Sequence, residues 1–145
     1  MTKKESGKES EGAREIQQKY LELQLYDQQM RQAQQQMQAV EQQVSEIEYV
    51  VQCINDVAKV DVGTEIFIPI SAGVFLKAKL LDNKDALINV GAGTAVKKTL
   101  PEVMEMMKTQ SRELRKVQED IAAKMEEIAR RAALVESEVR KLTGV

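Results

Sequence analysis

The chain has 145 residues, 43% of them hydrophobic and 30% charged, and its 21 basic residues nearly balance its 23 acidic ones. This composition indicates one ordinary folded chain, and it lacks the basic stripe interleaved with aromatics that nucleic-acid-binding proteins carry. No apolar run approaches the roughly 20 residues that a membrane-spanning helix needs. We therefore expect neither nucleic acid nor a membrane as a partner.

Histidine is absent and cysteine occurs once, as Cys53. These counts exclude a Cys–His nucleophile pair and a zinc-ligand cluster, and they remove the commonest general base. The chain also has neither a GxxxxGK[ST] phosphate-binding loop nor a GxGxxG motif after a strand. We therefore expect no enzyme activity, no catalytic residue, no metal and no cofactor. A lone cysteine and the lack of a signal-peptide-like apolar stretch favour a cytoplasmic protein.

Residues 1–12, MTKKESGKESEG, mix Lys, Glu, Ser and Gly and offer no apolar side chain to bury after Met1. Such a composition predicts a disordered tail. A nucleic-acid or membrane-binding arm is the functional alternative, but the Lys and Glu charges nearly cancel, which argues against it.

Residues 13–60 predict one long helix with a heptad repeat. Lys19 interrupts the second of its two apolar columns, and no Gly or Pro occurs from Ala13 to Lys59. At about 1.5 Å per residue the helix would be roughly 70 Å long, and so narrow an apolar stripe needs a partner helix. The first column, position a, holds Ile16, Leu23, Met30, Met37, Val44, Val51 and Ala58; the second, position d, holds Lys19, Tyr26, Ala33, Val40, Ile47 and Ile54.

Residues 61–99 change to a β-strand pattern. EIFIPI, VFLKAKLL and DALINVG alternate at period two and are rich in β-branched residues, and a short fourth strand follows near residues 95–98. Small-residue turns at 71–73 and 91–93 fit two hairpins. Four short strands from one chain are too few to cover their own apolar faces. We therefore expect these hairpins to complete a sheet or barrel with other chains.

Residues 100–143 predict the second long helix. Thr99 and Glu102 form a capping box at its start, Pro101 is tolerated in its first turn, and Gly144 ends it. Its d column holds Leu100, Met107, Leu114, Ile121, Ile128, Val135 and Leu142, and its weaker a column holds Met104, Ser111, Gln118, Met125, Ala132 and Val139.

The two heptad helices can pair antiparallel with residue numbers that sum to 158, as Ile16 and Leu142 do. Large side chains then face small ones in several layers, for example Ala33 opposite Met125, which keeps the volume of the seam even. This register is a hypothesis, because shifts by one heptad also satisfy the repeat. The fold class we predict is α+β and mostly α: a long antiparallel coiled coil joined by two β-hairpins.

A long helix, two hairpins and a returning heptad helix resemble the prefoldin family. Two hairpins resemble its alpha class of the archaeal type, since the beta class has one. The resemblance rests most on the stretch from Ile68 to Thr99, IPISAGVFLKAKLLDNKDALINVGAGTAVKKT, and above all on VGAG at residues 90–93. In the helices it rests mainly on the heptad pattern.

The resemblance implies an ATP-independent molecular co-chaperone. Such a subunit would assemble as two alpha plus four beta-class subunits, its hairpins joined into an intersubunit β-barrel. The coiled-coil tips would hold unfolded client proteins and pass them to a group II chaperonin. The alternative function is a coiled-coil structural or adaptor subunit of a prefoldin-like assembly, which a fully polar tip would favour.

Two sets of residues are candidates for binding. Apolar residues at the free end of the helix pair are proposed to bind clients, although those on the seam have packing as their alternative role: Ile16, Tyr20, Leu21, Leu25, Leu134, Val139 and Leu142. Apolar strand residues are proposed for subunit assembly: Ile66, Ile68, Ile70, Val74, Leu76, Ile88 and Val90. A third, off-seam group near the strands is expected to pack beneath the barrel or against a neighbouring subunit: Tyr49, Val50, Cys53, Val57, Val103 and Met106.

Overall fold

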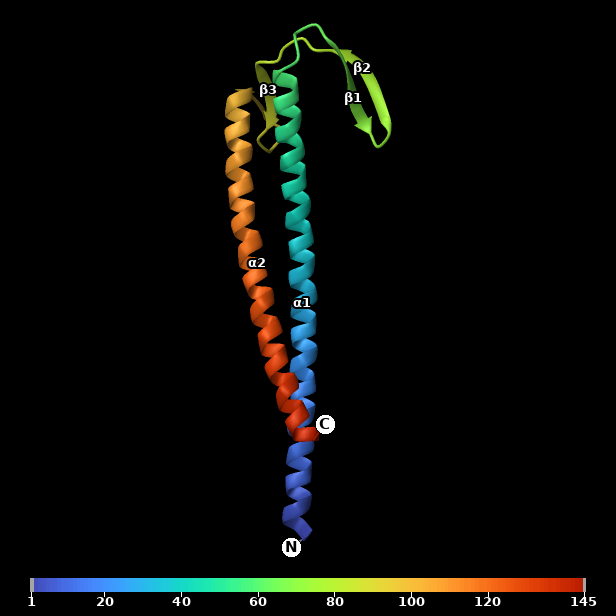
Figure 1. Ribbon diagram of the computed structural model, residues 1–145, viewed down its shortest axis with the longest axis vertical. Helices are drawn as coiled ribbons and strands as arrows, with labels where there is room; N and C mark the ends of the chain where they lie inside the picture. Colours follow the sequence, from blue (N-terminus) through green and yellow to red (C-terminus); the bar gives the residue numbers. More distant parts are fainter. Residues whose placement is uncertain (1, 145) are drawn as a thin grey trace. The chain divides into compact units, whose positions relative to one another are not determined.

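The computed structural model describes residues 2–144 and contains two long helices and two hairpins (Figure 1). In chain order they are α1 (Thr2–Ala58), β1 (Glu65–Ser71), β2 (Val74–Lys79), β3 (Asp85–Asn89), β4 (Ala95–Thr99) and α2 (Leu100–Thr143). The predicted fold class is confirmed. The chain divides into two compact units, one formed by residues up to Glu41 and from Arg115 onward, the other by Gln42–Leu114.

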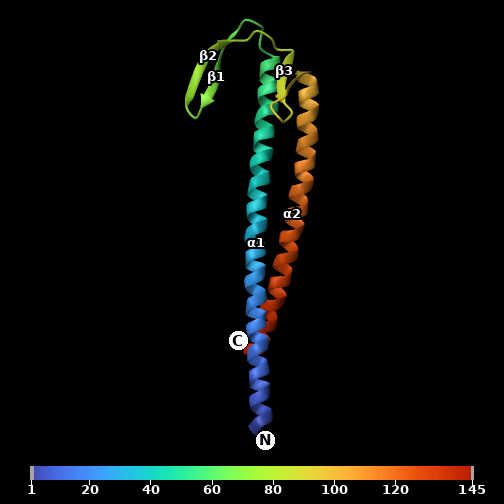
Figure 2. The same cartoon turned by 180° about the vertical axis from the view of Figure 1, so that it is seen from behind.

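In the first unit the segments of α1 and α2 run antiparallel and side by side, as both views show (Figures 1 and 2). The buried side chains are those of the heptad columns: Ala33 is 1% exposed, and Ile121, Ile128, Val135 and Val139 are buried as well. Gln, Glu, Lys and Arg occupy most of the remaining, exposed positions. The seven-residue repeat therefore marks the packed seam, as a coiled coil requires.

The pairing inside this unit agrees with the register in which residue numbers sum to 158. Tyr26 and Met30 of α1 line one small cleft with Ala132 and Ile128 of α2, their partners in that register. A shift by one heptad would separate these pairs by about 10 Å along the helix axis, given a rise of about 1.5 Å per residue.

Residues 2–12 are helical, whereas their composition predicts a disordered tail. Helix α1 is already formed at Thr2 and continues through Gly7 and Gly12 without a break; Met1 lies outside the described residues. Lys, Glu and Ser are compatible with a helix, and each glycine costs only about 1 kcal/mol relative to alanine. Residues 7–11 are exposed, so this turn of helix gains its stability from continuity with the heptad region rather than from packing.

The second unit carries both hairpins, each an isolated two-stranded antiparallel sheet. In the first, Ile68 faces Leu76 and Phe67 faces Lys77, with a bulge between Pro69 and Ser71. A proline cannot donate to the ladder, which accounts for the irregularity at this point. In the second, Ile88 faces Val96 across the sheet. Its turn places Gly91, Ala92 and Gly93 at positive φ, where glycine is unstrained.

Short polar contacts fix the bases of the hairpins. The Gly63 amide donates to the Leu80 carbonyl at 2.7 Å, and the Asn83 side-chain amide donates to the Val60 carbonyl at 3.0 Å. The predicted capping box is present at the start of α2. The Glu102 amide donates to the Thr99 hydroxyl and the Thr99 amide donates to the Glu102 carboxylate, each at 3.3 Å.

Candidate functional site

Large apolar side chains are exposed near the end of the first unit. Tyr20, Leu21 and Leu25 of α1 and Leu134 of α2 are each between 50% and 61% exposed. The numbers of Leu25 and Leu134 sum to 159, one more than the register sum, so these two residues lie at the same level of the helix pair. Most of the surrounding outward positions carry polar side chains, so these four residues form an exposed apolar group.

Three other predicted tip residues belong partly or wholly to the seam. Val139 is 7% exposed, so the intact helix pair does not present it to a client. Position a of a heptad points at the partner helix, and that geometry buries Val139. Ile16 is half-buried, whereas Leu142, close to the end of α2, is exposed. We name the four exposed residues Tyr20, Leu21, Leu25 and Leu134 the tip patch.

Lys19 lies on the d column beside this patch and is held by an ion pair. Its ammonium donates to the Glu138 carboxylate, and the two side chains are 18% and 52% exposed respectively. The hydrogen bond to Glu138 is the largest cause that raises the pKa of Lys19 above its ordinary value of 10.5, while burial acts in the opposite direction. A charged residue therefore occupies a seam position without being left unpaired, at the level where the tip patch lies.

The β1–β2 hairpin of the second unit carries large apolar side chains on both faces. One face carries the predicted assembly residues Ile68 and Leu76, and both are exposed in the single chain. Of the other predicted assembly residues, Ile70, Val74 and Val90 are exposed, while Ile66 and Ile88 are half-buried. The opposite face carries Phe67 and Phe75, 70% and 58% exposed.

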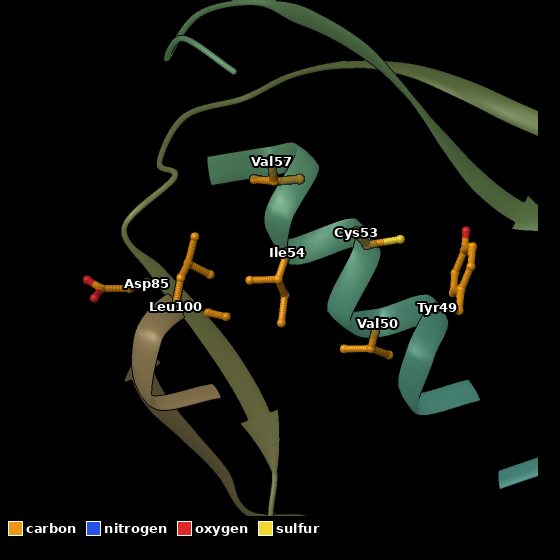
Figure 3. Close-up of a pocket in the computed structure, with 8 residues that line it drawn as sticks. Tyr49, Val50, Cys53, Ile54, Val57, Asp85 and Leu100 are labelled. Atoms are coloured by element: carbon orange, nitrogen blue, oxygen red, sulfur yellow. The ribbon is translucent and has the colours of Figure 1, made fainter. Parts of the chain in front are cut away.

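An apolar groove of about 350 Å³ lies on α1 where β3 and the start of α2 approach it. Figure 3 shows the Ile54 and Leu100 side chains pointing toward one another and the Tyr49 ring beside the Cys53 sulfur. The neighbouring Cys53 thiol is the main cause that raises the pKa of the Tyr49 hydroxyl above its ordinary value of 10.0. We name this feature the α1 groove, and its lining consists of Tyr49, Val50, Cys53, Ile54, Val57, Asp85, Ala86 and Leu100.

The members of the off-seam group near the strands differ in their exposure. Val103 is buried within the second unit and Met106 is half-buried, whereas Tyr49 and Val50 remain exposed at the α1 groove. Within residues 2–144 no cluster of three or more potential metal-ligating side chains occurs. Neither of the helices over that range combines the length and apolarity needed to cross a bilayer.

The family model described as prefoldin subunit matches residues 26–144, more than three quarters of the chain. A curated relative, prefoldin subunit alpha 1 of Methanocaldococcus jannaschii, is 32% identical over 128 residues, which is 88% of this chain and 87% of the relative. The chain belongs to the prefoldin family. Prefoldin subunit alpha of Methanobrevibacter smithii is similar as well, with 26% identity over 93% of this chain and 92% of that protein.

A solved structure supports the fold of this prefoldin subunit. The match is to a chain from a cryo-EM structure of filamentous prefoldin from Methanocaldococcus jannaschii, with a TM-score of 0.69 and 10% sequence identity. It covers 79% of this chain and 95% of that one. The relatives identify an archaeal alpha-class prefoldin, so the subunit is of a chaperone type and its family is not enzymatic. The tip patch lies partly before residue 26, where the family model begins.

The phenylalanine face of β1–β2 is a feature of this prefoldin subunit that sequence reasoning overlooked. The alternating isoleucines of EIFIPI assign the assembly role to one face of the hairpin only. A signal for the other face was present, because the only two phenylalanines of the sequence, Phe67 and Phe75, both fall on it. Leu81 and Leu87, also exposed and unassigned, form no comparable pattern.

Proposed function

We propose that this prefoldin subunit is an ATP-independent co-chaperone that captures unfolded protein at the tip patch. The observation that carries the proposal is the grouping of four large apolar side chains, each at least half exposed, near one end of the first unit. Unfolded chains of many sequences share only exposed apolar segments, and an apolar surface without a shaped pocket can bind them with little selectivity. The coiled-coil adaptor role would not need these leucines.

The proposal also includes the route of the client. The subunit would assemble with beta-class prefoldin subunits, two alpha plus four beta, and deliver clients to a group II chaperonin in the cytoplasm. The exposed apolar faces of both hairpins support assembly with other chains, because a two-stranded sheet is marginal by itself in water. The strand residues Ile68 and Leu76 are the central contacts that we assign to this assembly.

The test replaces Leu21 and Leu25 together by serine. Both side chains are exposed and lie off the seam, so Leu21→Ser with Leu25→Ser should leave the unfolding temperature and the assembled mass unchanged. We expect aggregation of a denatured client, followed by light scattering without ATP, to be suppressed at least several-fold less well. The matched control is Gln24→Ser with Gln28→Ser, an exposed pair with the same spacing on α1.

Suppression equal to that of the unchanged protein would contradict client capture at the tip patch and favour the adaptor role. Delivery is measured separately, by adding a group II chaperonin and ATP to the client complex and following release of folded client. Client that stays bound under these conditions would contradict the delivery step alone.

A further inference from the structure

The phenylalanine face of the β1–β2 hairpin is a projecting apolar surface that the chain itself does not cover. Cross-strand pairing places Phe67 opposite Lys77 and Phe75 opposite Pro69, so all four side chains share this face. Lys79 pairs with Glu65 on the same face. Aromatic side chains bury the largest apolar area of any residue type, so leaving both exposed points to a partner surface.

The α1 groove is an open apolar recess within the same unit. Its volume of about 350 Å³ lies within the range of about 300 to 1,000 Å³ that is usual for ligand-sized pockets, so a phenyl ring has room to enter. Tyr49 and Val50 at the groove are exposed, and Phe67 remains 70% exposed, so the chain's own hairpin does not fill the recess.

The charges of the hairpin face and of the α1 wall of the groove are complementary, while Asp85 on the other wall is already paired with Lys97. The segment of α1 from 42 to 58 contains Glu46, Glu48 and Asp56, all exposed, and contains no Lys or Arg. The phenylalanine face of the hairpin carries Lys77 and Lys79 against the single Glu65, with which Lys77 pairs at 2.9 Å. Opposite charges around an apolar contact orient the partners and exclude wrong ones.

We propose that the α1 groove binds the phenylalanine face of the β1–β2 hairpin of a second copy of this chain. A phenyl ring of this face, that of Phe67 or Phe75, enters the groove. Lys77 and Lys79 then lie toward the acidic segment of α1. The recess and the projecting surface are different patches of one chain, so each copy of a pair can use both patches, and such a reciprocal pair is closed by two-fold symmetry. This inference deepens the assembly part of the proposed function, because it adds a side-chain contact to the pairing of hairpins.

The single cysteine makes the contact measurable in the full chain. Cys53 lines the α1 groove, so Phe75→Cys places a second thiol on the surface that enters it. Under mild oxidation we expect a disulfide-linked dimer between Cys53 of one copy and position 75 of another, located by mass spectrometry of the linked peptides. Disulfides form only when the two Cα atoms approach within about 7 Å.

The matched control is Leu76→Cys, which sits next in sequence on the opposite face of the hairpin. We expect at least about tenfold more linked dimer from position 75 than from position 76, since only the phenylalanine face meets the groove. Adding Cys53→Ser to Phe75→Cys should abolish the dimer. Phe67→Cys, which keeps Phe75 in place, is the second variant should the first weaken the contact.

Failure of both phenylalanine positions to exceed the Leu76→Cys control would overturn the inference, as would a 53–75 link within one chain. A link that appears only to a beta-class subunit would overturn the choice of a second copy as the occupant. The aggregation assay, run on the same preparation, separates the two proposals. A linked dimer that holds no client overturns the proposed function alone, and assembly with client holding but no link overturns this inference alone.

Discussion

Lys19 is the residue at which the heptad pattern of α1 fails, and the structure explains how the failure is tolerated. The side chain occupies a seam position with 18% exposure but donates to Glu138 on α2, so its charge has a partner. The pair is only partly screened from water, and such pairs add little net stability. The apolar contact that a leucine would make at this d position is absent, which weakens the seam beside the tip patch.

Lys19→Leu should therefore stabilise the end of the first unit. A leucine buries additional apolar surface in the seam, and Glu138, which is 52% exposed, stays hydrated without its partner. We expect the unfolding temperature, followed by circular dichroism, to rise by roughly 2 to 4 °C. If client capture needs a loose helix end, suppression of client aggregation should fall at the same time.

Lys19→Gln is the control, because it removes the charge without adding apolar surface, and it should not raise the unfolding temperature. The pKa of Lys19 is raised above 10.5, so any stability from the ion pair is fully present below that value and is lost as the pH rises through the higher folded-state pKa. The difference between the unchanged protein and Lys19→Gln should accordingly be constant from about pH 7 to 9. A lower unfolding temperature for Lys19→Leu would contradict the account.

The register of the antiparallel helix pair can be tested at the layer that contains Ala33. Ala33, 1% exposed, is the smallest side chain of its column, and the register sum of 158 places it opposite Met125. Ala33→Leu should overpack this layer and lower the free energy of unfolding by about 1 to 3 kcal/mol, measured by urea denaturation. Adding Met125→Ala restores the layer's volume and should recover most of the loss.

The control for the register is Gln118→Ala, which removes a side chain one heptad away on the same column of α2. It should not rescue Ala33→Leu, because residues in different layers do not share the overpacked space. Rescue by Gln118→Ala and none by Met125→Ala would show that the helices pair one heptad away from the register in which residue numbers sum to 158.

The elements differ in how far the sequence alone could predict them. The heptads predicted both helices and their buried columns, and Thr99 with Glu102 predicted the start of α2, because these signals are local and periodic. The composition of residues 2–12 predicted disorder, but the helix of the heptad region continues through them without packing of its own. The tip patch followed from the positions off the seam, but the burial of Val139 depends on the partner helix and needed the structure.

At the scale of the molecule, a single chain leaves the apolar faces of two hairpins exposed. Ile68 and Leu76 form a cross-strand pair on one face of β1–β2, and Phe67 and Phe75 cover the other. No third strand of the described chain pairs with this sheet. The cost of such a surface in water favours assembly through the hairpins rather than through the helices, which is the assembly that we propose.

Ile68→Ser with Leu76→Ser should therefore separate assembly from folding. Burying each side chain at an interface contributes about 1.5 to 3 kcal/mol, so losing both should weaken association at least about a hundredfold. After co-expression with a beta-class prefoldin subunit, light scattering should report a mass near that of the free chain, while the helical signal in circular dichroism stays unchanged because both residues are exposed in the single chain. Gln24→Ser with Gln28→Ser, at exposed positions of α1 outside the hairpins, is the control and should assemble normally. A serine variant that assembles to the full mass would show that this face of the hairpin is not where the subunits meet.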